Sequence, residues 1–154
     1  MNIFKNKKGF TAIEIILVIV ILGIGLGLSI LYLQTSQFRA DINSQVAQFS
    51  SHVRLAQSNA LSGQSDVSHG IHLEETSYTI FQGDAYSPSD PLNFEIEMTG
   101  PTTIQNISLN GGGSDIIFTN ILGETDDYGT INFVSTQTQK TISVEITKFG
   151  TVIY

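Results

Sequence analysis

The stretch Lys7–Leu33, KKGFTAIEIILVIVILGIGLGLSILYL, decides how this chain is built. Its second part, Ile15–Leu33, runs for 19 residues in which only one serine and one tyrosine offer polar side-chain atoms. As an α-helix rising about 1.5 Å per residue, this run is roughly 28 Å long, close to the ~30 Å hydrocarbon core of a bilayer. We therefore expect a helix that crosses a membrane once.

The flanking charges predict the orientation of this helix. Lys5, Lys7 and Lys8 precede the run, and Arg39 is the one basic residue close behind it. Because basic residues favour the cytoplasmic side, we expect the N-terminus in the cytoplasm and the rest of the chain outside. The end of the run, 31–34, lacks a small-residue cleavage site, so the helix is predicted to be retained. A plain signal anchor is the alternative that charge and length leave open.

Glu14 is the unusual residue of this region, because it lies between Ile13 and Ile15 at the start of the apolar run. A carboxylate at the centre of a bilayer costs about 2.5–3.5 kcal/mol, and less near the interface. A plain anchor has no use for such a group, so we infer a partner for it. The alternative is that Glu14 lies among the lipid headgroups.

The stretch KKGFTAIEIILVIVILGIG resembles the class III signal of type IV pilins and pseudopilins. The resemblance implies that prepilin peptidase cleaves after Gly9 and that the new N-terminal residue, Phe10, is N-methylated. It also implies that Glu14 pairs with the N-terminal amine of a neighbouring subunit. Ala12 departs from the family, which usually has leucine there, and no proline interrupts the following helix.

Three glycines, Gly23, Gly25 and Gly27, lie within the apolar run. Each lowers helix propensity by up to about 1 kcal/mol relative to alanine, so they could supply local flexibility. Small residues also allow helices to approach closely in membranes. The sequence leaves both interpretations open.

Composition limits what the rest of the chain does. The chain has 154 residues and a net charge of −7, and loss of 1–9 would leave 4 basic and 14 acidic residues. Such an acidic surface argues against nucleic acid as a partner and is compatible with cation binding. There are no cysteines, so no disulfide stabilises the exported part.

The helix is predicted to continue through 34–61, because apolar residues recur there at spacings of three and four. Ser62 and Gly63 provide a stop signal. This spacing places one apolar stripe on the helix, and we expect it to pack on a sheet. The stripe consists of Phe38, Ile42, Val46, Phe49, Val53, Ala56 and Ala60.

From Asp66 onward, short alternating apolar runs separated by glycine, proline and asparagine predict about seven or eight β-strands. The expected fold class is α+β, a pilin-like fold with a long N-terminal helix packed on antiparallel β-sheet. Four segments are predicted: a leader peptide, a transmembrane and filament-core helix, an amphipathic outer half of the helix, and a β-rich head. They correspond to 1–9, 10–33, 34–63 and 64–154.

A second resemblance concerns the end of the helix. The stretch Arg54–Leu61, RLAQSNAL, is similar to the corresponding stretch of GspH/FimT-like minor pseudopilins, and the C-terminal ITKFGTVIY fits their ending. The resemblance implies a subunit of low copy number at or near a filament tip. FimT-like members that bind DNA carry a basic cluster near the C-terminus, where this chain has only Lys140 and Lys148.

The strongest candidate for metal binding is the loop Gly123–Gly129, which holds Glu124, Asp126 and Asp127. Clustered carboxylates suit Ca²⁺, although their spacing matches no EF-hand and a solvated acidic turn is the alternative. The histidines at 52, 69 and 72 are not expected to converge on a metal. No nucleophile motif is present, so we do not expect an enzyme.

These observations predict a structural subunit, minor pilin or pseudopilin, of a type IV pilus, type II secretion or competence filament. Its expected partners are other pilin or pseudopilin subunits, prepilin peptidase, the inner-membrane assembly platform, and membrane lipid before assembly. We expect a single-pass protein of the cytoplasmic membrane that enters an extracytoplasmic filament. The alternatives are a major pilin subunit, a filament-anchored module that captures DNA or adheres to surfaces, and a signal-anchored exported domain.

Overall fold

The computed structural model describes residues 9–154, and for 29–39 it describes the backbone alone. The predicted leader, 1–9, therefore lies outside the described residues except for Gly9. The structure divides into two compact units, one ending at Ser36 and one from Gln37 to Tyr154. The second unit is called the head below. The four predicted segments stay a prediction.

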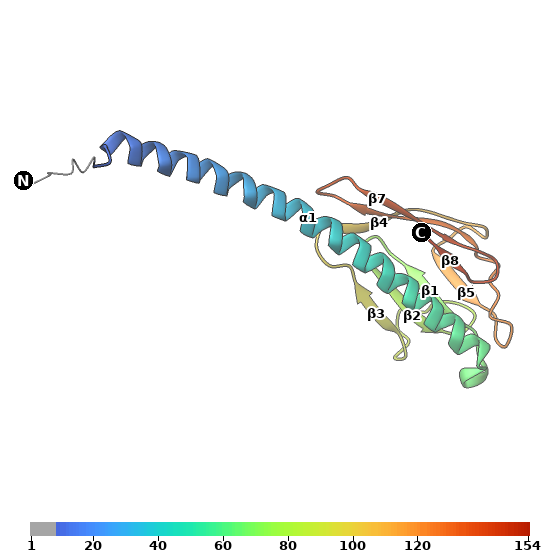
Figure 1. Ribbon diagram of the computed structural model, residues 1–154. Helices are drawn as coiled ribbons and strands as arrows, with labels where there is room; N and C mark the ends of the chain where they lie inside the picture. Colours follow the sequence, from blue (N-terminus) through green and yellow to red (C-terminus); the bar gives the residue numbers. More distant parts are fainter. Residues whose placement is uncertain (1–8) are drawn as a thin grey trace, which may run out of the picture. The chain divides into compact units, whose positions relative to one another are not determined.

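Helix α1 extends from Ala12 to Leu61 (Figure 1). It ends where the sequence predicts, because Gly63 adopts the left-handed conformation (φ 66°) that stops a helix and favours glycine. A short 3₁₀ helix, η1, follows at Gln64–Asp66. The local sequence thus determines the end of the helix.

The apolar stripe of α1 is buried in the head. Six of its predicted members have no exposed surface, which confirms the prediction for them, and Phe38 lies outside the described side chains. The serines and arginine between them are mostly exposed, as expected for a helix that packs by one face. The six are Ile42, Val46, Phe49, Val53, Ala56 and Ala60.

Eight strands follow in the described part of the chain, which agrees with the predicted number. All of their pairings are antiparallel, so the α+β prediction is confirmed. The strands are β1 His69–Leu73, β2 Ser77–Gln82, β3 Phe94–Glu97, β4 Thr102–Leu109, β5 Asp115–Phe118, β6 Gly129–Ser135, β7 Thr141–Ile146 and β8 Val152–Ile153.

The strands form two sheets of four, in the orders β3-β2-β1-β5 and β4-β6-β7-β8. In the first sheet, Ile71 of β1 pairs with Ile80 of β2 on one side and with Ile116 of β5 on the other. In the second sheet, β6 lies between β4 and β7. The chain thus passes from β4 of the second sheet to β5 of the first, and then back to β6 of the second. Periodicity alone does not specify this crossover.

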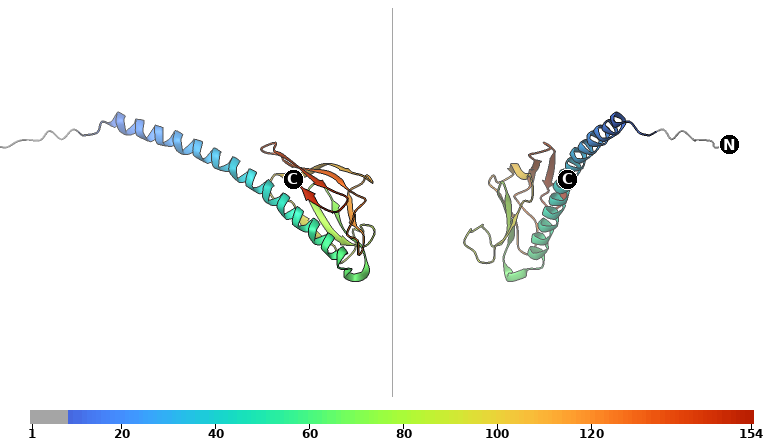
Figure 2. Two further views of the ribbon diagram at one scale, coloured as in Figure 1. Left: turned by 45° about the vertical axis from the view of Figure 1, so that its right-hand side comes forward. Right: turned by 90° about the vertical axis from the view of Figure 1, so that its left-hand side faces the viewer.

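The head's part of α1 lies along the sheets (Figure 2), and one hydrophobic core contains residues of this helix and of both sheets. Phe49 of α1 packs against Tyr78 of β2 and Phe133 of β6, with ring centroids 5.2 Å and 5.1 Å away. The stripe of α1 therefore belongs to the core that both sheets share.

Candidate functional site

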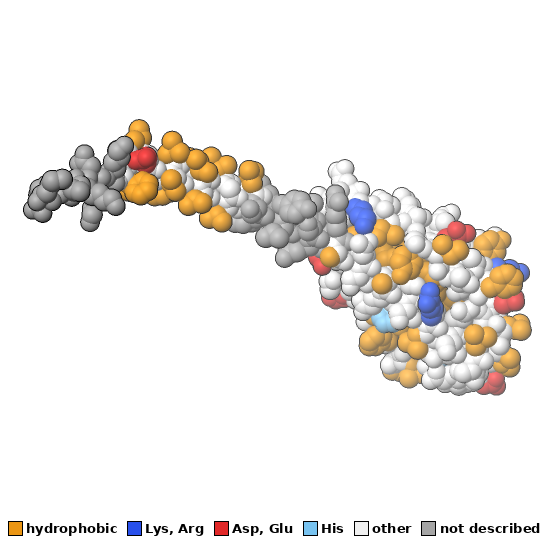
Figure 3. Space-filling model, viewed as in Figure 1, with side chains coloured by type: hydrophobic (Ala, Val, Ile, Leu, Met, Phe, Trp, Pro, Cys, Tyr) orange, Lys and Arg blue, Asp and Glu red, His pale blue; other side chains and the backbone are white. Residues whose placement is uncertain are grey.

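The first part of α1 presents apolar side chains in every direction. The apolar side chains from Ile15 to Leu28 are 52–67% exposed, and the only other residues between them are glycines. Figure 3 shows these hydrophobic side chains along the segment, with one acidic side chain near its start. A helix that is hydrophobic all round is typical of one buried in a membrane or in the core of a large assembly.

Within the residues whose side chains are described, no helix is long and apolar enough to cross a membrane. The predicted span, Ile15–Leu33, continues through 29–33, whose side chains lie outside those described.

The three residues predicted for processing and assembly lie together at the start of α1. An added Cβ on Gly9 would meet nothing within 4 Å, and Phe10 is 83% exposed. Glu14 is exposed in the first turn of the helix. No described group of the chain occludes the Gly9–Phe10 bond, but the roles of these residues stay predictions.

Glu14 has a partner that the sequence interpretation missed. Oε2 of Glu14 accepts hydrogen bonds from the backbone N–H and the hydroxyl of Thr11, at 2.9 Å and 3.0 Å. The backbone N–H of Glu14 points back to Thr11 Oγ1, at 3.4 Å. This reciprocal arrangement is a capping box, and the Thr-x-x-Glu spacing is its sequence signal. It begins the helix and leaves Oε1 of Glu14 without a described partner.

An apolar depression lies beside this carboxylate. It has a volume of about 340 Å³ and is lined by Phe10, Glu14, Ile15, Val18 and Ile19. Its exposed lining is entirely apolar, and the Glu14 side chain borders it.

The structure also bears on the three glycines of the apolar run. An added Cβ on Gly23, Gly25 or Gly27 would meet nothing within 4 Å. Within this chain, therefore, no described neighbour requires a small residue at these positions. Gly23 and Gly27, four residues apart, share one face of the helix, where a second helix could approach closely.

The three calcium candidates each have a different environment. Asp126 forms an ion pair with Lys148, at 3.7 Å. Oδ2 of Asp127 accepts a hydrogen bond from the backbone N–H of Ile117 on β5, at 3.1 Å. Glu124 lines a cavity described below. Among the described residues, no group of three or more histidine, cysteine or acidic side chains lies close enough to hold a metal ion. Calcium binding and a solvated acidic turn both stay untested interpretations of this loop.

The three histidines have different environments. His52 on α1 contacts the hydroxyl of Tyr78 through Nδ1, at 2.7 Å. Burial lowers the pKa of His52 and raises the pKa of the Tyr78 hydroxyl. His69 faces the core and is 1% exposed, and His72 lies on the opposite face of β1, where its ring stacks on Tyr86. The described histidines therefore form no common site.

Two glutamines of α1 hold loops in place, and the sequence interpretation missed both. Gln45 is 6% exposed, and its amide exchanges hydrogen bonds with the backbone of Thr99. The amide of Gln57 donates to the carbonyls of Gly123, at 2.9 Å, and Phe149, at 2.6 Å. A glutamine on a helix is usually a solvated residue, so no local signal distinguished these two.

Comparison with known proteins bears on the fold. No family model matches the chain, and no curated protein sequence matches it. The chain is similar to the solved structure of the minor pseudopilin EpsH from the Type 2 Secretion System of Vibrio cholerae. The match has a TM-score of 0.55 and 13% sequence identity, and it covers 73% of this chain and 94% of that one. The fold of a minor pseudopilin, to which the sequence pointed, is confirmed.

Proposed function

We propose that this chain is a minor subunit of a filament of the type II secretion class. One observation carries the proposal: a helical segment that is apolar on all sides, with a single carboxylate at its start, in a chain whose fold is that of a minor pseudopilin. Such a segment requires an apolar environment, because moving each valine, leucine or isoleucine side chain out of water stabilises by roughly 1.5–3 kcal/mol.

The apolar segment would occupy two apolar environments, one after the other. Before assembly, the segment Phe10–Leu33 lies in the cytoplasmic membrane, with the basic leader on the cytoplasmic side. Prepilin peptidase removes 1–9, and Phe10 becomes the N-methylated terminus. In the filament, the same segment packs against the helices of other pseudopilin subunits.

Glu14 would select the position of each subunit in this assembly. Leaving lipid for a bundle of helices gains little hydrophobic free energy, because lipid tails are as apolar as the helices. A carboxylate and an amine, each costly in an apolar environment, offset one another when two subunits meet at the right height. The capping box with Thr11 leaves Oε1 of Glu14 available for that amine.

Intact-mass analysis tests the proposal most directly. The full chain is produced together with a prepilin peptidase, extracted from membranes and weighed. We expect the mass of 10–154 with one added methyl group. Gly9→Leu, which keeps the apolar segment and removes the glycine, should retain the whole leader. Finding Met1–Gly9 uncut in the unaltered chain would overturn the proposal and favour the signal-anchored domain.

Copy number separates a minor subunit from a major one. Quantitative mass spectrometry of purified filaments should find this chain at a small fraction of the main subunit. If it accounts for most of the filament mass, the chain is the major subunit instead.

A further inference from the structure

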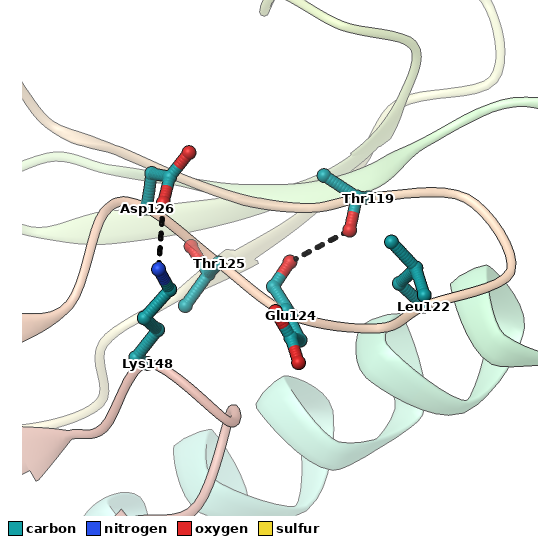
Figure 4. A pocket seen from close by; sticks show the side chains of 6 residues that line it. All are labelled: Thr119, Leu122, Glu124, Thr125, Asp126 and Lys148. Atoms are coloured by element: carbon teal, nitrogen blue, oxygen red, sulfur yellow. Dashed lines mark hydrogen bonds and ion pairs between the residues drawn. The ribbon is translucent and has the colours of Figure 1, made fainter.

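A cavity of about 240 Å³ lies in the head between the loop that joins β5 to β6 and the turn that joins β7 to β8. It is lined by Thr119, Leu122, Glu124, Thr125, Asp126 and Lys148, whose side chains are drawn in Figure 4. Small-molecule sites usually have volumes of roughly 300–1,000 Å³, so this cavity suits one long side chain better than a cofactor.

The cavity holds a carboxylate that has no partner in the described part of the chain. The backbone carbonyl of Glu124 is fixed by the N–H and hydroxyl of Thr119, at 2.9 Å and 3.1 Å. Its side chain, which is only partly exposed, forms no hydrogen bond or ion pair with any described residue. The neighbouring cation, Lys148, pairs with Asp126 instead (Figure 4). A half-buried carboxylate in this position would gain from a cation supplied from outside.

Exposed apolar side chains lie on the two loops that form the cavity and at the end of α1. Leu61 is 50% exposed, Ile121 and Leu122 are each 68% exposed, and Phe149 is 70% exposed. These four residues are called the loop patch. Ile121 has a φ of 68°, in the left-handed region that a β-branched residue rarely adopts. The fold thus accepts an unfavourable backbone conformation at a residue whose apolar side chain faces solvent.

The loop patch is held rigidly to the end of α1. Gln57 donates to the carbonyls of Gly123 and Phe149, and so joins both loops to one side chain. The N–H of Ile121 donates to the carbonyl of Ala60, at 2.9 Å. A surface fixed in this way binds at a smaller entropic cost than a mobile loop.

We propose that the cavity receives a lysine or arginine side chain from a segment of another protein, with apolar neighbours of that side chain resting on the loop patch. The aliphatic stem of the incoming residue lies against Leu122, and its charged head meets Glu124. This inference depends on the head alone and not on the proposed filament role.

Charge favours a different protein over a second copy. The segment 37–154 carries 13 of the 14 acidic residues and four of the seven basic ones. Two such heads repel each other, whereas a basic partner is attracted. The described basic side chains of the head are Arg54, Lys140 and Lys148, and the last two already contact Asn43 and Asp126.

Peptide titration of the full chain in nonionic detergent micelles tests the inference. The probe is acetyl-Leu-Lys-Leu-amide, and the readout is the NMR shift of the Ile121 and Leu122 methyl groups. The control probe is the same peptide with glutamine in place of lysine. We expect saturable shifts with the lysine peptide and about tenfold weaker binding of the glutamine peptide, because a charge-assisted contact is lost.

Two variants make the result decisive. Glu124→Gln should weaken binding of the lysine peptide about tenfold, to the affinity of the glutamine peptide. Glu97→Gln changes an exposed carboxylate on β3, at the opposite edge of the first sheet from β5, and should leave binding unchanged. Unperturbed spectra elsewhere in the head show that each variant is folded.

Equal binding of the two peptides, or full binding by Glu124→Gln, would overturn the inference. Self-association of the peptide-free chain that shifts the same methyl groups and is abolished by Arg54→Gln would also overturn it. That result would assign the cavity to a second copy.

Discussion

The two halves of α1 differ in where their apolar surface goes. From Ile15 to Leu28 the apolar side chains are at least half exposed on every side of the helix. From Ile42 to Ala60 six apolar side chains form a stripe with no exposed surface, and most of the other residues are polar, although Leu55 is 48% exposed on another face. One continuous helix therefore combines a segment that the chain itself does not cover with a segment that is the centre of its core.

The two halves of α1 are therefore stabilised by different surroundings. The second half is stabilised by the chain's own two sheets, which enclose residues such as Phe49. The first half is stabilised, in our proposal, by lipid and then by other subunits. Substitutions in the first half of α1 and in the head should therefore have different consequences, and two matched pairs of variants test this.

The largest effect is expected from truncating a core side chain. Phe49→Ala removes a fully buried ring that contacts Tyr78 and Phe133, and should lower the free energy of unfolding by about 3–5 kcal/mol. Leu22→Ala, at a site 58% exposed, should change it by less than about 0.5 kcal/mol. Urea denaturation of the full chain in detergent, followed by circular dichroism, measures both. Similar losses for the two variants would contradict the distinction.

Replacing glycine with alanine should lower stability in the head and raise it in the first part of α1. At Gly70 of β1 an added Cβ would lie 2.5 Å from Phe81 Cζ and 2.8 Å from the carbonyl oxygen of Ile116, so Gly70→Ala should destabilise the head by about 1–3 kcal/mol. At Gly23 the space is open, so Gly23→Ala should stabilise the helix by up to about 1 kcal/mol. Thermal unfolding reports the first change and helical circular dichroism in micelles the second. A loss of helicity in Gly23→Ala would indicate that the glycine itself is required.

The smallest effect is expected from pH, through the contact between α1 and β2. Burial lowers the pKa of His52 in the folded chain below its ordinary value of 6.5. The unfolded chain then binds the proton more readily, so the stability associated with neutral His52 is present above pH 6.5 and is lost as the pH falls below it. Unfolding free energies measured between about pH 8 and about pH 5 should fall less steeply for His52→Gln. Identical slopes would exclude His52 as the cause.

The signals at the start of α1 are local. The roles of Gly9, Phe10 and Glu14 follow from a resemblance in one short stretch and stay predictions. The capping box of Thr11 and Glu14 has its own signal in the same stretch, the Thr-x-x-Glu spacing. The loop at Glu124 was recognised as acidic, yet its chemistry depends on contacts with residues distant in the chain. The partner of Asp126 is Lys148, and the partner of Asp127 is the backbone of β5.

The sequence by itself determined the elements of this protein: a helix that ends at Leu61, a stripe from Ile42 to Ala60, and eight short strands. These features follow from periodicity and turn residues, which act over a few positions. Only the tertiary structure decided the division into two sheets, the crossover that places β5 beside β1, and the way Gln57 joins two loops. Pairing between distant segments depends on how whole surfaces fit together, and no local pattern contains that information.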